Sequence, residues 1–154
     1  DQLKQLRDAL QLWAVEKGGS AEIARDPFHL LSLLQIKPGA FRAAVLFASE
    51  NKRGDLEETS MVDRVYTVVL SRGRGLTAKP TDSLVEGQGD GEPLFDLVEQ
   101  LREIIRGLSF SAGTTEVTPN YTGTEVFAVD GKALDAYQLT FQIGTLLPEP
   151  EPAT

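Results

Sequence analysis

The sequence PLFDLVEQLREIIRGL, at residues 93–108, decides the class of fold. Its apolar residues recur three and four positions apart, which places them on one side of a helix. They are Leu94, Leu97, Val98, Leu101, Ile104, Ile105 and Leu108. Glu103 and Arg106 lie three residues apart on the polar side, where opposite charges support a helix. The segment therefore predicts an amphipathic helix that opens at Pro93 and covers a core.

Two further helices are predicted before it. Residues 2–16 carry apolar side chains at helical spacing, and the run Gly18-Gly19-Ser20 ends this helix. The apolar positions are Leu3, Leu6, Leu10 and Trp13. Asp26 followed by Pro27 has the pattern of an N-cap and a first helical position, which predicts a short helix through Leu34.

The strands are predicted from β-branched and apolar runs. Residues 41–49 and 62–71 are almost continuously apolar, so either both faces of each strand are covered or another subunit covers one face. Residues 125–144 form a hairpin with a turn at Asp130-Gly131, in which Tyr137, Leu139, Phe141 and Ile143 alternate with polar residues. Leu134 does not share the parity of these side chains, which predicts a bulge or break near Asp135-Ala136.

Together these elements predict an α+β fold. We expect a mainly antiparallel sheet with two long helices packed on one face and extended loops at residues 50–60 and 72–92. The length predicts a single domain over residues 1–147. Residues 148–154 alternate proline and glutamate at first and should form an extended tail.

Composition excludes several classes of function. The chain has no cysteine and one histidine, His29, which excludes thiolate metal sites and any site that needs two histidines from one chain. The net charge of −8 argues against a surface that binds duplex DNA. It does not argue against an acidic surface past which DNA slides without binding. The sequence has no apolar run long enough to cross a membrane.

The motif candidates favour contacts with proteins over catalysis. The run Arg72-Gly73-Arg74-Gly75 lacks the remainder of a phosphate-binding loop, and its arginines suit a contact with an acidic neighbouring subunit. Asp55, Glu57 and Glu58 lack the ligand spacing of a calcium loop and suit a solvated hairpin tip. We predict no catalytic, cofactor-binding or metal-ligating residue, and we expect a structural His29 packed beside Phe28 and Leu30. The predicted subunit or partner contacts are Arg72, Arg74, Lys79, Asp55, Glu57 and Glu58.

The order of these segments resembles the small neck and tail-terminator proteins of long-tailed bacteriophages. The similar features are the first helix over Leu3–Trp13, a β-hairpin with an extended loop, the helix Leu94–Leu108 and closing strands over Glu125–Ile143. The ending Asp135-Ala136-Tyr137-Gln138-Leu139-Thr140-Phe141-Gln142-Ile143 resembles their closing strand. No single invariant motif carries the resemblance, which covers most of the chain.

The resemblance implies a structural protein of the virion, made in the cytoplasm of a bacterial host. Such a protein forms a ring, usually of six copies, on the last ring of the tail tube, stops tube growth and meets the head connector or stopper protein. DNA passes through the ring without specific binding, and the protein needs no cofactor. The alternative from the residues alone is a monomeric or dimeric α+β module that binds a small ligand or peptide through residues 72–92. A hydrolase with an unrecognised site is a third hypothesis.

Overall fold

The computed structural model describes residues 1–34, 37, 40–52, 61–73, 92–129, 131 and 134–146. The helices are α1 (Gln2–Glu16), α2 (Pro27–Leu33) and α3 (Leu94–Arg106). The strands are β1 (Ser20–Ala24), β2 (Phe41–Lys52), β3 (Met61–Gly73), β4 (Phe110–Ala112), β5 (Thr115–Val117), β6 (Asn120–Val126) and β7 (Leu134–Leu146). The α+β class is confirmed.

Local sequence signals set the helix ends. The Asp1 side chain accepts a hydrogen bond from the backbone N–H of Leu3 at 3.0 Å and caps α1. The helix stops before Gly18, whose φ of +82° favours glycine. Gly19 is needed for close packing, because an added Cβ would lie 2.6 Å from the ring of Phe41. The helix α1 therefore ends at the expected place.

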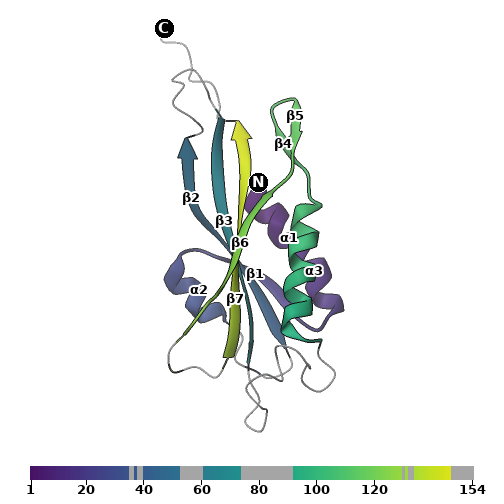
Figure 1. Ribbon diagram of the computed structural model, residues 1–154, viewed down its shortest axis with the longest axis vertical. Helices are drawn as coiled ribbons and strands as arrows, with labels where there is room; N and C mark the ends of the chain where they lie inside the picture. Colours follow the sequence, from purple (N-terminus) through teal and green to yellow (C-terminus); the bar gives the residue numbers. More distant parts are fainter. Residues whose placement is uncertain are drawn as a thin grey trace.

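The main sheet is mixed. Its strand order is β1-β2-β3-β7-β6, with β1 parallel to β2 and the other neighbours antiparallel, while β4 and β5 form a separate two-stranded sheet (Figure 1). The expected antiparallel sheet is therefore correct only in part. Strand β1 was not expected, because Ser20–Ala24 holds a single strongly strand-favouring residue, Ile23, and owes its conformation to pairing with β2.

The bulge or break predicted near Asp135-Ala136 is absent from the β3–β7 ladder, although the pairing of β6 with β7 ends beside it, at Val126 opposite Tyr137. The ladder between β3 and β7 runs without a register shift from Gly73 opposite Leu134 to Met61 opposite Leu146. Leu134 differs in parity from Leu139 because the two side chains pack on opposite faces of the sheet, each in its own apolar cluster. Register shifts occur instead between Phe47 and Ser49 in β2, and in β6.

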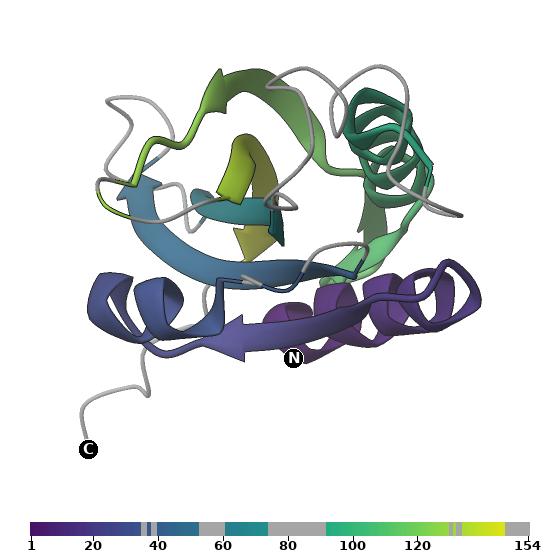
Figure 2. The same cartoon turned by 90° about the horizontal axis from the view of Figure 1, so that it is seen from below.

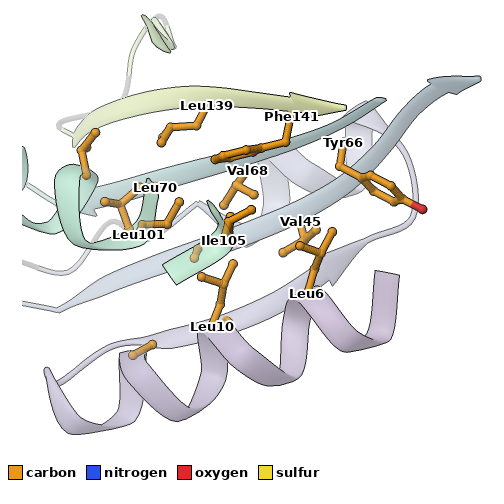
Figure 3. Close-up of a cluster of buried hydrophobic side chains, with 14 of the residues drawn as sticks. Leu6, Leu10, Val45, Tyr66, Val68, Leu70, Leu101, Ile105, Leu139 and Phe141 are labelled. Atoms are coloured by element: carbon orange, nitrogen blue, oxygen red, sulfur yellow. The ribbon is translucent and has the colours of Figure 1, made fainter. Parts of the chain in front are cut away.

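The first face of the sheet carries the larger core. Both α1 and α3 contribute buried side chains to it, and in Figure 1 both helices lie to the right of the long strands. Figure 3 shows the centre of this cluster, where side chains of the two helices meet those of three strands. The fully buried members include Leu6 and Leu10 of α1, Leu101 and Ile105 of α3, Val45, Val68, Leu70, Leu139 and Phe141.

A smaller core covers part of the second face. Leu30 and Leu34, at α2 and its end, pack with Ala44 of β2, Val69 of β3 and Leu134 of β7. In Figure 1, α2 lies on the opposite side of the strands from α1 and α3. The central residues of β2 and β3 are therefore apolar because their own chain covers both faces, so a neighbouring subunit is not needed at this level of the sheet.

A polar network ties the first helix to the third. The ammonium of Lys17 donates to Oε1 of Glu92 at 2.5 Å, and the amide of Gln100 donates to Oε2 of the same carboxylate at 2.6 Å. The indole N–H of Trp13 donates to Oε1 of Gln100 at 3.0 Å. These hydrogen bonds fix the residue that precedes α3 against the end of α1. The hydrogen bond from Lys17 is the main reason why the pKa of Glu92 lies below its ordinary value.

Replacing Lys17 by methionine should raise the pKa of Glu92 toward its ordinary value, because the substitution removes the strongest stabilisation of the carboxylate. A lowered folded-state pKa stabilises the fold above the unfolded-state pKa and loses that contribution as pH falls through the folded value. Lys17→Met should therefore make the free energy of unfolding depend less on pH in the acid range. An NMR titration of the Glu92 carboxyl measures the change, with Lys4→Met on the exposed side of α1 as control. An unchanged titration of Glu92 would contradict the assignment.

Candidate functional site

The structure places one of the six predicted contact residues. Asp55, Glu57, Glu58, Arg74 and Lys79 lie outside the described residues. The sixth, Arg72, is the last residue but one of β3 and has a fully buried side chain. Its Nη1 donates to the backbone carbonyl of Glu92, just before α3. The expectation that Arg72 reaches an acidic neighbouring subunit from an open loop is therefore corrected, because its side chain lies inside the fold.

The buried guanidinium of Arg72 is only partly satisfied. Within the described part of the chain, its Nε and Nη2 have no hydrogen-bond partner. Burial lowers the pKa of Arg72, and the nearby charge of Glu92 opposes that shift. A glycine-rich sequence context suggested exposure, whereas the pairing of Arg72 with Phe41 and Asp135 holds it in the middle strand of the sheet. Arg72 thus contributes to the interior and not to a described surface.

A projecting part of the β2–β3 hairpin is the main candidate surface. Strand β1 pairs with β2 only as far as Ala24 opposite Leu46. Beyond that point β2 continues through Phe47–Lys52, where every residue is exposed, and among the described strands it pairs there only with β3. We call β2 residues 47–52 with β3 residues 61–65 the hairpin arm. In Figure 1 the arm extends past the level of α2 and β1, toward the top of the view.

The base of the arm is fixed by side chains from two other elements. The hydroxyl of Tyr66 donates to Oε1 of Gln2 at 2.7 Å, and the amide of Gln2 donates to Oγ1 of Thr145 at 2.8 Å. Phe47 meets the ring of Tyr66 edge-on, with 5.7 Å between centroids. Phe47 still exposes 43% of its surface. The arm therefore presents an apolar side chain from a rigid base.

Charges and a bulge occupy the free edge of the arm. Glu50 accepts from Nε of Arg64 across the two strands at 2.9 Å, and this hydrogen bond raises the pKa of Arg64. The register shift between Phe47 and Ser49 bends the strand at the point where β1 ends. Such features limit uncontrolled pairing of an exposed edge, and they leave backbone N–H and C=O groups that a matching partner strand can bond.

The edge at β1 is closed by the chain itself. The backbone N–H of Ala21 donates to the side chain of Gln11 at 2.7 Å, and the N–H of Arg25 donates to Nδ1 of His29 at 2.9 Å. Figure 2 shows α1 and α2 flanking β1 at this edge. His29 therefore has a structural role, as expected. The two side chains take up backbone donors on either side of Ile23, which makes β1 a poor site for strand addition.

Exposed apolar side chains were missed at the sequence level. Phe28, expected to pack beside His29, exposes 85% of its surface, and Leu12 exposes 76%. Val126 of the edge strand β6 exposes 72%. The position of Leu12 off the apolar stripe of α1 could have revealed it. Phe28 gave no such signal, because a short helix has too few turns for its apolar face to be read from spacing.

Among the described residues, no cluster of three or more histidine or acidic side chains is arranged to hold a metal ion. In the same part of the chain, no helix has the length and apolar character of a membrane span. Comparison with models of known protein families and with curated proteins finds no match.

Proposed function

We propose that this protein is a tail terminator of a long-tailed bacteriophage, which forms a ring on the end of the tail tube, stops its growth and joins it to the head connector. The hairpin arm carries the proposal, because its outer edge of β2 is exposed from Phe47 to Lys52 and has no β1 beside it. A neighbouring copy can complete this edge by strand pairing. Head-to-tail contacts of this kind close into rings when the rotation between copies allows it.

The rest of the structure is consistent with assembly through projecting parts. The chain covers its own sheet at the level of Ala44 and Val69, so the subunit has a core before it assembles. The net charge of −8 favours a channel that DNA crosses without being held. In the sequence, Asp55, Glu57 and Glu58 lie between the two strands of the arm, and they remain proposed contacts.

The proposal is tested by assembly of the purified chain, alone and with tail tubes of the phage that encodes it. Light scattering and electron microscopy should show rings, or a monomer that caps tubes. A chain that stays monomeric, does not bind tail tubes and binds a small molecule would instead support a ligand-binding module. Hydrolysis that is lost with one acid-to-amide substitution would support an enzyme.

Phe47→Glu should abolish ring formation or tube capping, lowering the assembled fraction at least tenfold, while the folded monomer remains. The matched control is Phe95→Glu in α3. Phe95 has the same exposed fraction as Phe47, 43%, and also packs against a tyrosine ring, with 5.3 Å between the centroids of Phe95 and Tyr137. Circular dichroism checks folding of both variants. If the two variants assembled to the same extent, the proposal that the arm forms part of the interface would be contradicted.

A further inference from the structure

A positively charged hollow lies between the last turns of α3 and the start of β6, in a chain that is acidic overall. Its volume is about 400 Å³. The lining residues are Arg102, Arg106, Thr118, Pro119, Asn120 and Tyr121. We call it the α3–β6 groove. The guanidinium carbon of Arg102 lies 5.5 Å from the ring centroid of Tyr121, so one wall combines a cation with an aromatic face.

The two arginines of the α3–β6 groove have more donors than their protein partners use. Nε of Arg102 lies 3.5 Å from Oε1 of Glu103, and Nη1 of Arg106 lies 3.0 Å from the same oxygen. A single carboxylate therefore faces two guanidinium groups. Nε of Arg102 is buried and makes no hydrogen bond within the described part of the chain. Each guanidinium has five N–H donors, so the groove can accept further carboxylates.

The chain itself contains a segment of complementary chemistry. Residues 147–154 read LPEPEPAT and follow β7 in the sequence, outside the described residues. Proline at every second position favours the polyproline II conformation, and such segments dock in grooves lined by aromatic side chains. Glu149 and Glu151 would then lie about 6 Å apart along the segment, at about 3.1 Å per residue, with their side chains directed about 120° apart because this conformation has three residues per turn. Arg102 and Arg106 are also about 6 Å apart along α3, at about 1.5 Å per residue.

We propose that the α3–β6 groove binds the Pro-Glu segment of a neighbouring copy of this chain, with Glu149 and Glu151 paired to Arg102 and Arg106 and a proline ring against Tyr121. Strand β7 passes Asn120 at Gln142 and ends four residues later at Leu146, so the segment after it begins beyond its own groove. A return would need a sharp reversal, which alternating prolines resist. This inference rests on the proposed ring, which supplies the neighbouring copy.

A charge exchange tests the contact between copies. One variant carries Arg102→Glu and Arg106→Glu, and the other carries Glu149→Arg and Glu151→Arg. Each alone should raise the concentration needed for half-assembly at least tenfold, and an equimolar mixture should restore assembly to within about threefold of the wild type. Restoration only when all four substitutions share one chain would place the segment in its own groove and overturn the proposal. Unchanged assembly of the single-sided variants would do so as well.

A second measurement does not depend on rings. A fluorescent peptide of residues 147–154 is titrated with the full chain carrying Glu149→Gln and Glu151→Gln, so that the chain's own segment competes less. Binding should weaken at least tenfold with Arg106→Gln, whose side chain is exposed and tolerates substitution, and should weaken with salt. Arg25→Gln, at another exposed arginine, should leave binding unchanged. Rings without peptide binding would overturn this inference alone, whereas peptide binding with neither rings nor capping of tail tubes would support the groove and refute the ring.

Discussion

Replacing Phe141 by alanine is expected to lower the free energy of unfolding by about 3–5 kcal/mol, a large share of the roughly 5–15 kcal/mol that stabilises a typical domain. Phe141 is fully buried on the first face of the sheet, between the helices and the strands (Figure 3). Its ring centroid lies 5.6 Å from that of Tyr121. Truncation removes these contacts and leaves a cavity, because neighbours on two helices and three strands cannot all move inward. Chemical denaturation measures the loss.

The adjacent residue provides the control for Phe141. Gln142 also lies in the ladder with β3, but its side chain points to the other face of the sheet and is only partly buried. Gln142→Ala should change the free energy of unfolding by less than about 0.5 kcal/mol, as is usual for substitutions away from a core. A similar cost for both substitutions would contradict the assignment of the two faces of β7.

Arg72→Met is expected to raise the free energy of unfolding by about 1 kcal/mol or more, although it removes a hydrogen bond. The guanidinium is fully buried, and its Nε and Nη2 have no partner among the described residues, so the charge is poorly compensated. Methionine fills much of the same volume with apolar atoms. The carbonyl of Glu92, which loses its donor, belongs to a partly exposed residue and can bind water.

The substitution Arg72→Lys separates the effect of the positive charge on stability from the effect of the shape of the side chain. Lysine keeps a positive charge in the same interior position but cannot reproduce the planar donor group. The lysine variant should therefore be less stable than the methionine variant, and thermal unfolding at neutral pH ranks the two. A methionine variant less stable than the wild type would show that the hydrogen bond to Glu92 outweighs the cost of burying the charge.

The long amphipathic elements could be predicted from sequence because their periodicity reports directly which side is buried. The stripe of α3 and the alternation of Tyr137, Leu139 and Phe141 both lead to the first face of the sheet. A bulge or break was predicted near Asp135-Ala136 because the prediction gave the strand through Tyr137 only one apolar face. The second core under α2 supplies the other face, and its few buried residues are spread over five segments of the chain.

Strand β1 and the status of Arg72 could not be predicted from local sequence. Ser20–Ala24 becomes a strand by pairing with β2, which is a tertiary effect that overrides weak propensity. Arg72 looked like a loop residue because Gly73 and Gly75 follow it, yet two neighbouring strands hold it in the sheet. The hairpin arm is defined by where β1 ends, and the α3–β6 groove is defined by how α3 packs beside β6. Such junctions between distant segments leave no periodic trace in the sequence.

The strand order has a consequence for synthesis of the chain. Strand β7 follows all the other described strands in the sequence, yet it lies between β3 and β6 in the sheet. While the ribosome makes the intervening residues, β2 and β3 can already form a hairpin, but the inner edge of β3 stays open. Closing a ladder between such distant segments is slow compared with forming local contacts. We expect the nascent chain to be most prone to misassociation in this interval, until β7 emerges and closes the sheet.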